Sequence, residues 1–169
     1  MIAGAGTLGA ELCEQAVTLD AIVVAVGGGS QAVGALVAAR KLRPNVAVYG
    51  VQALSAAAIH DSWHARTRVT TESADTFADG LATRATYDMT FDALREGLAG
   101  FVAVSDAAMA DAIRVLLRTT HNLAEGAGAA GLAGLVALRD HLAGKTIAIV
   151  LSGSNIDEVT LRRVLAREL

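Results

Sequence analysis

The segment with the clearest chemical potential is a run of three glycines and a serine: Gly27, Gly28, Gly29 and Ser30. It follows the apolar run 22–26, which predicts a buried strand, and precedes a helix-like segment that begins at Gln31. Glycines allow the backbone to turn tightly and to point successive N–H groups inward, and the start of a helix adds partial positive charge. We therefore expect this loop to hold a phosphate group, with the hydroxyl of Ser30 as a further donor. The alternative is a tight turn without a ligand.

A second loop of small polar residues, 151–157, also follows an apolar strand-like run, 147–150. Ligands in open α/β sheets bind beyond the carboxyl ends of the strands, so the two loops are expected to converge on one ligand. An equally good explanation for Ser152, Asn155 and Asp157 is ordinary capping of the helix that follows.

Three other patterns give weaker signals. Glu125 precedes the small-residue run 126–129, from which its carboxylate could reach a cleft, or it simply begins the next helix favourably. Gly4 to Gly9 reads G-x-G-x-x-G, but no strand precedes it, so a dinucleotide site is not favoured. His60 and His64 have the spacing of a zinc-peptidase helix, but the acid between them is an aspartate and no third ligand follows. A surface helix with two histidines is the better interpretation.

Strand-like and helix-like segments alternate along the whole chain, an order that predicts a three-layer α/β fold with a mainly parallel sheet and helices on both faces. The expected strands lie near 21–26, 46–51, 100–104 and 146–151. The expected helices cover 8–19, 31–42, a segment capped by Ser105 or Asp106, 126–141, and a last one that begins near Ile156. The polar stretch 66–79 predicts a surface loop.

The composition supports an α/β domain and excludes several function classes. Hydrophobic residues make up 53% and aromatic residues 4%, so the core must consist mainly of aliphatic side chains. The net charge is −3 and the basic residues are scattered, which argues against a nucleic-acid partner. The uncharged run 21–39 is long enough to cross a bilayer, but its central glycines would break a membrane helix. Without a signal-like N-terminus, and with Cys13 as the single cysteine, the chain is expected to be soluble and cytoplasmic.

Taken in order, the motifs resemble those of fold-type II pyridoxal phosphate (PLP) enzymes, most closely the serine/threonine dehydratases (ammonia-lyases) and serine racemases. The resemblance spans the chain and rests on G-x-G-T at 4–7, the glycine loop at 27–30, A-D-G at 78–80, E-x-A-G at 125–128 and S-G-x-N at 152–155. It implies that the glycine loop holds the cofactor phosphate. It also implies that Ser152 hydrogen-bonds the pyridine nitrogen beside Gly153, and that Glu125 is an active-site acid.

The activity that this resemblance implies is β-elimination from a hydroxy amino acid such as threonine or serine, which yields a 2-oxo acid and ammonia. A serine at the ring nitrogen would leave that nitrogen unprotonated, which favours elimination over transamination. The family's Schiff-base lysine lies upstream of its G-x-G-T, and Lys41 and Lys145 are expected to lie away from the loops. The chain therefore resembles the C-terminal half of such an enzyme, a single domain over 1–169 that is expected to be inactive alone. Its expected partners are an amino-acid substrate and either further copies of itself or a missing N-terminal half.

Two departures from the family pattern bear on metal binding. Gln52 stands where many relatives carry a cation-binding glutamate, and Ala58 where an acid often lies, so no metal site is expected. A different function class stays open as well, namely a non-catalytic phospholigand-binding or regulatory module, which would bind its ligand reversibly and without covalent capture. A third hypothesis is a folding or interaction surface, which would reveal itself by self-association.

Overall fold

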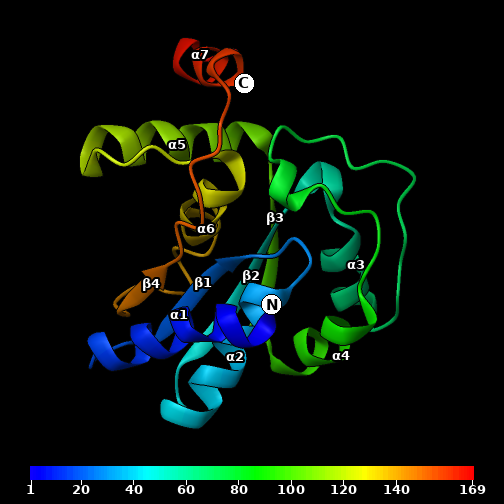
Figure 1. Ribbon diagram of the computed structural model, residues 1–169, viewed down its shortest axis with the longest axis vertical. Coiled ribbons are helices and arrows are strands. Elements are labelled where there is room, and N and C mark those ends of the chain that lie inside the picture. Colours follow the sequence, from blue (N-terminus) through cyan, green and yellow to red (C-terminus); the bar gives the residue numbers. More distant parts are fainter.

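Four short parallel strands form the sheet at the centre of the computed structural model, which describes all residues from 1 to 169 (Figure 1). The strands are β1 (Ala21–Ala25), β2 (Ala47–Ala53), β3 (Gly100–Val104) and β4 (Ile147–Ile149), and their order across the sheet is β3-β2-β1-β4. Ala21 at the start of β1 pairs with Ala47 on one side and with Ile147 on the other. All four strands fall where the apolar runs predict them.

Helices cover both faces of the sheet. One face carries α1 (Ile2–Gln15), α2 (Ser30–Leu42), α3 (Ala58–Ala65) and α4 (Asp88–Gly97), and the other carries α5 (Asp106–Thr120) and α6 (Gly126–Ala137). The side chains of β1 alternate between these layers, so that Ile22 and Val24 pack against the first group and Val23 against the second. All three are 0% exposed, as expected for a parallel strand covered on both faces. The expected three-layer α/β fold is confirmed.

Several element boundaries differ from those expected. The first helix runs from 2 to 15 rather than from 8 to 19, so the G-x-G-T segment is helical. Its small residues allow α1 to pack closely on α2, where a Cβ atom added to Gly34 would lie 2.6 Å from the backbone nitrogen of Gly6. Helix α6 ends at Ala137, and α4 was not anticipated. The uncharged run 21–39 divides into β1, the glycine loop and part of α2, and no helix has the length and apolar character needed to span a membrane.

The polar stretch 66–78 contains no helix or strand, as expected, and the carboxylate of Asp106 anchors its C-terminal end. Asp106, in the first turn of α5, accepts a hydrogen bond from Thr76 Oγ1 at 2.7 Å and another from the backbone N–H of Phe77 at 3.1 Å. The chain then passes directly into the short 3-10 helix η2 (Asp79–Leu81). Asp106 therefore fixes the segment that delivers Gly80 and Leu81 to the carboxyl end of the sheet.

Protonation of Asp157 is expected to fray the last helix, α7 (Glu158–Ala166). Asp157 caps this helix by accepting a hydrogen bond from the N–H of Thr160 at 2.9 Å, and hydrogen bonding from Thr160 lowers the pKa of Asp157 below its ordinary value. Because the folded-state pKa is depressed, the contribution is present above the unfolded-state pKa of about 3.9 and is lost as the pH falls through the folded value. Amide exchange of α7 should accelerate there, whereas Asp157→Asn, which caps without titrating, should show no such step.

Candidate functional site

A pocket of about 250 Å³ lies at the carboxyl ends of β1 and β4. Its lining residues are Ala25, Gly27, Gly28, Gly29, Ser30, Gln31, Gly80, Leu81, Glu125, Ala127 and Ser152. The two loops singled out in the sequence therefore converge on one space, as the parallel strands predict. Glu125 joins them there, and Gly153 lies directly behind the lining.

At Gly27 and Gly29 the glycine loop lies too close to its neighbours for a side chain to fit. A Cβ atom on Gly27 would lie 2.1 Å from the carbonyl oxygen of Gly80, so the loop and the η2 segment are in direct backbone contact. Gly29 has a φ of 85°, in the left-handed region that favours glycine, and it forms the N-cap of α2. The N–H groups of Gly27, Gly28 and Gly29 donate to no acceptor within the chain. Three backbone donors are thus left for a ligand.

The electrostatics of the pocket come from the backbone rather than from basic side chains. Helix α2 begins at Ser30 and helix α6 begins at Gly126, so two helix N-termini face the pocket with their partial positive charge. No lysine or arginine lines the space, and Glu125 is its one acidic residue. Such an arrangement suits an anionic group that is held by N–H donors.

Glu125 and the loop after β4 are packed against each other. The N–H of Glu125 donates to the carbonyl oxygen of Gly153 at 3.1 Å, and a Cβ atom on Gly153 would lie 2.2 Å from Glu125 Oε1. Glu125 is the N-cap residue of α6, yet its side chain makes no capping hydrogen bond. Its carboxylate is half-buried and reaches both the main pocket and a small adjoining one that Asn155 and Asp157 line. Ser152 is exposed and lines the main pocket.

Neither lysine approaches this pocket. Lys41 lies in the last turn of α2, at the end opposite the glycine loop, and Lys145 precedes β4, whereas Ser152 follows the carboxyl end of the same strand. Both positions agree with the expectation from the sequence.

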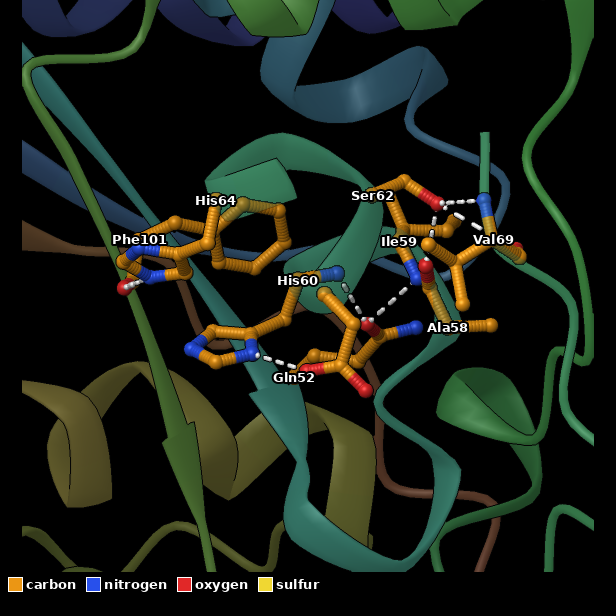
Figure 2. A network of polar contacts seen from close by, with 9 residues as sticks. Gln52, Ala58, Ile59, His60, Ser62, His64, Val69 and Phe101 are labelled. Carbon is orange, nitrogen blue, oxygen red and sulfur yellow. Dashed lines mark hydrogen bonds and ion pairs between the residues drawn. The ribbon is translucent and has the colours of Figure 1, made fainter. Parts of the chain in front are cut away.

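Gln52 is fully buried at the carboxyl end of β2, and both polar atoms of its side chain make hydrogen bonds within the chain. Its Oε1 accepts from the N–H groups of Ile59 at 3.1 Å and His60 at 2.8 Å, and its Nε2 donates to Thr83 Oγ1 at 2.9 Å. Figure 2 shows the first two of these bonds at the start of α3. The buried Ala58 lies in the same helix start and offers no ligand atom. Gln52 therefore connects β2, α3 and the segment that follows η2.

The two histidine rings of α3 are in contact at a tilt of 58°, and each has a hydrogen-bonding partner nearby. Their ring centroids lie 4.4 Å apart, and His60 Nδ1 is 2.8 Å from Asp61 Oδ1. His64 Nε2 is 3.1 Å from the carbonyl oxygen of Phe101 in β3 (Figure 2). No group of three or more histidine, cysteine or acidic side chains lies close enough to hold a metal ion. The histidine pair is part of the contact between α3 and the edge of the sheet.

Two residues near the pocket were missed in the sequence because they lie on the unanticipated helix α4. Thr90 Oγ1 donates to the carbonyl oxygen of Gly28 at 3.0 Å. Tyr87, the N-cap residue of α4, lies beside the same glycine, where an added Cβ atom would be 3.8 Å from Tyr87 Cε2. The amphipathic pattern around Phe91 and Leu94 is the signal that could have revealed this helix.

Comparison with known proteins gives a consistent picture. Residues 1–153 match the family described as pyridoxal-phosphate dependent enzyme. An L-threonine ammonia-lyase of Thermotoga maritima is 37% identical over 169 residues, which is all of this chain and 42% of that relative. An L-threo-3-hydroxyaspartate ammonia-lyase of Saccharomyces cerevisiae is 32% identical over 157 residues, 93% of this chain and 48% of that relative. The chain thus spans about half the length of the curated relatives it matches.

Solved structures of similar enzymes have the same fold as this chain. A threonine deaminase isoform from Solanum lycopersicum superposes with a TM-score of 0.92 at 31% identity, covering 98% of this chain and 46% of that one. A serine racemase from maize gives a TM-score of 0.88 at 28% identity, covering 99% and 52%.

Proposed function

Because the chain belongs to the pyridoxal-phosphate dependent enzyme family, we propose that it supplies the cofactor-binding part of an ammonia-lyase acting on a hydroxy amino acid such as threonine or serine. Its 169 residues would form one domain, equivalent to the C-terminal part of the family's large domain. The observation that carries the proposal is the convergence of the glycine loop, Gly80, Glu125 and Ser152 on one pocket.

The residues of the pocket fit pyridoxal phosphate. The phosphate would lie on the free N–H groups of the glycine loop, at the N-terminus of α2, with the hydroxyl of Ser30 as a further donor. Ser152, from the loop that follows β4, would hydrogen-bond the pyridine nitrogen beside Gly153. The pocket of about 250 Å³ leaves room for a ligand, whereas the close approach of Gly27 to Gly80 leaves no room for a side chain at Gly27.

Bound pyridoxal phosphate supplies an electron sink for negative charge at the α-carbon of an amino acid. A serine hydroxyl at the ring nitrogen cannot act as a counter-charge for a protonated ring, so it moderates that sink and favours loss of a β-hydroxyl over transamination. Glu125 is the one carboxylate that lines the pocket, and we assign it the role of holding or moving a proton at its carboxylate oxygens.

The absence of a lysine from the pocket lining has two readings. In the first, the 169-residue chain binds the cofactor reversibly but cannot turn over substrate alone, since the amine that captures the cofactor must come from elsewhere. In the second, the chain is a non-catalytic module that binds pyridoxal phosphate or another phosphorylated small molecule. Release of ammonia and a 2-oxo acid by a protein that contains this chain together with a lysine-bearing partner segment would decide for the first.

An absorbance titration with pyridoxal phosphate, followed by borohydride reduction and mass spectrometry, tests the proposed site. We expect saturable, reversible binding without a retained adduct. A stable adduct on Lys41 or Lys145 would contradict the assignment of both lysines to remote positions. No binding at all would contradict the proposal that the loops of this chain suffice to form the cofactor pocket.

Ser152→Ala is expected to weaken binding of pyridoxal phosphate about tenfold, the effect of one hydrogen bond to the ring. Binding of inorganic phosphate should not change, because Ser152 is assigned to the ring and not to the phosphate. The exposed neighbour Ser154 provides the control, since Ser154→Ala removes a similar hydroxyl outside the pocket lining. Equal affinities for the parent chain and Ser152→Ala would remove Ser152 from the site.

A further inference from the structure

The glycine loop receives one side-chain hydrogen bond, and it comes from outside the pocket. Thr90 lies in the first turn of α4 and is 5% exposed. Its Oγ1 lies 3.0 Å from the carbonyl oxygen of Gly28 and 3.4 Å from that of Tyr87. A hydroxyl has a single hydrogen to donate, and the shorter contact is the one to Gly28.

This bond sets the orientation of the peptide unit between Gly28 and Gly29. The chain contains no cis peptide bond, so the carbonyl of Gly28 and the N–H of Gly29 point in opposite directions across one planar unit. The carbonyl points at Thr90, which does not line the pocket. The N–H of Gly29 therefore points away from α4, and it has no acceptor within the chain.

Thr90 also packs against the loop from the same side. A Cβ atom added to Gly29 would lie 3.1 Å from both Cβ and Oγ1 of Thr90 and 2.9 Å from Leu94 Cδ1. Gly29 is buried in this contact with its φ of 85°. Two restraints therefore act on the peptide unit between Gly28 and Gly29: the packing of Gly29 against Thr90 and the hydrogen bond to the Gly28 carbonyl.

Helix α4 is itself firmly held, so Thr90 is a fixed reference point. Leu94 is 1% exposed within the core, and its carbonyl oxygen accepts a hydrogen bond from Trp63 Nε1 of α3 at 3.1 Å. At the end of α4, Gly97 lies so close to Leu36 of α2 that an added Cβ atom would be 2.7 Å from Leu36 Cδ1.

We propose that Thr90 is a positioning residue for anion binding: its hydroxyl holds the Gly28 carbonyl outward so that the Gly29 N–H is preset to receive a phosphate oxygen. The inference rests on the proposed function, because it takes the glycine loop as the phosphate site. A donor that is already aimed loses no orientational freedom when the phosphate binds, and this preorganisation is what the hydroxyl supplies.

The test compares Thr90→Val, which keeps the shape and removes the hydroxyl, with Thr90→Ser, which keeps the hydroxyl. Affinities for inorganic phosphate and pyridoxal phosphate should fall about tenfold in Thr90→Val and stay within about twofold in Thr90→Ser. Affinity for pyridoxal, which lacks the phosphate, should stay within about twofold in both variants. The ¹H–¹⁵N resonance of Gly29 should shift on phosphate addition in the parent chain and in Thr90→Ser, but much less in Thr90→Val.

Ser62→Ala is the matched control for the loss of a buried hydroxyl. Ser62 Oγ donates to the carbonyl oxygen of Ala58 at 2.6 Å and accepts from the N–H of Val69 at 2.8 Å, away from the pocket (Figure 2). This variant should lose stability but keep its phosphate affinity. If Thr90→Val does not fold, Thr90→Ala and Thr90→Ser form a second pair, since both lack the methyl group and only alanine lacks the hydroxyl.

The outcomes separate the inference from the function on which it rests. If the parent chain binds neither phosphate nor pyridoxal phosphate, the proposed function is contradicted, and so is the inference that rests on it. A parent chain that binds both, together with an unchanged Thr90→Val, leaves the function standing and overturns only the role of Thr90. Equal losses for phosphate and pyridoxal would also overturn it, because they would reveal general damage to the pocket.

Discussion

Gly27→Ala is expected to weaken binding of pyridoxal phosphate by about a hundredfold, the effect of forcing one methyl group into a closely packed contact. The added Cβ atom would lie 2.1 Å from the carbonyl oxygen of Gly80, a backbone atom that no side-chain rotation can move away. Either the glycine loop or η2 must shift, and both line the pocket. Titration with pyridoxal phosphate, followed by absorbance, measures the loss.

The next residue provides the control for this experiment. A Cβ atom on Gly28 would lie 3.8 Å from Tyr87 Cε2, which is ordinary van der Waals contact. Gly28→Ala should therefore bind pyridoxal phosphate within a few-fold of the parent chain, although it also shortens the glycine run. Similar losses in both variants would show that the loop depends on glycine composition rather than on the contact between Gly27 and Gly80.

Gly128→Ala is expected to lower the free energy of unfolding by about 2 kcal/mol, because overpacking outweighs the better helix propensity of alanine. Gly128 is buried in α6, and its Cβ atom would lie 2.3 Å from the carbonyl oxygen of Gly153. The same oxygen accepts a hydrogen bond from the N–H of Glu125, so the substitution should also displace the loop after β4 that carries Ser152. Denaturant unfolding measures the first effect and cofactor titration the second.

Gly4→Ala is the matched control within a helix. Nothing lies within 4 Å of a Cβ atom added to Gly4 in α1, so alanine should raise the free energy of unfolding by about 0.5 kcal/mol. If Gly128→Ala were as stable as Gly4→Ala, the contact between α6 and the loop after β4 could not be as tight as described.

The parts of the fold that could be predicted are those that local sequence determines. Apolar runs of strand length identified every strand, and of the two expected caps of α5, Ser105 or Asp106, the hydroxyl of Ser105 is the one that caps. The convergence of Ser30 and Ser152 followed from one rule, that parallel strands end at the same edge of the sheet. None of these inferences needed a long-range contact.

The parts that could not be predicted depend on contacts between distant segments. Thr90 and Gly28 are 62 positions apart, and nothing in either local sequence indicates that they meet. The three hydrogen bonds of Gln52 likewise depend on where α3 and Thr83 lie in the fold. The first helix was placed too late because its glycines have low intrinsic helix propensity, which packing against α2 overrides.

The position of β4 in the sheet has a consequence for how the protein is made. Asp20, directly before β1, accepts a hydrogen bond from the N–H of Thr146, which lies 126 positions later in the chain. Contacts of such sequence separation carry a large loop-closure entropy and form late in folding. During synthesis, the glycine loop emerges from the ribosome long before the strand that brings Ser152 beside it. If the pocket is the cofactor site as proposed, the nascent chain should carry an incomplete site and should gain full cofactor affinity only after β4 has joined the sheet.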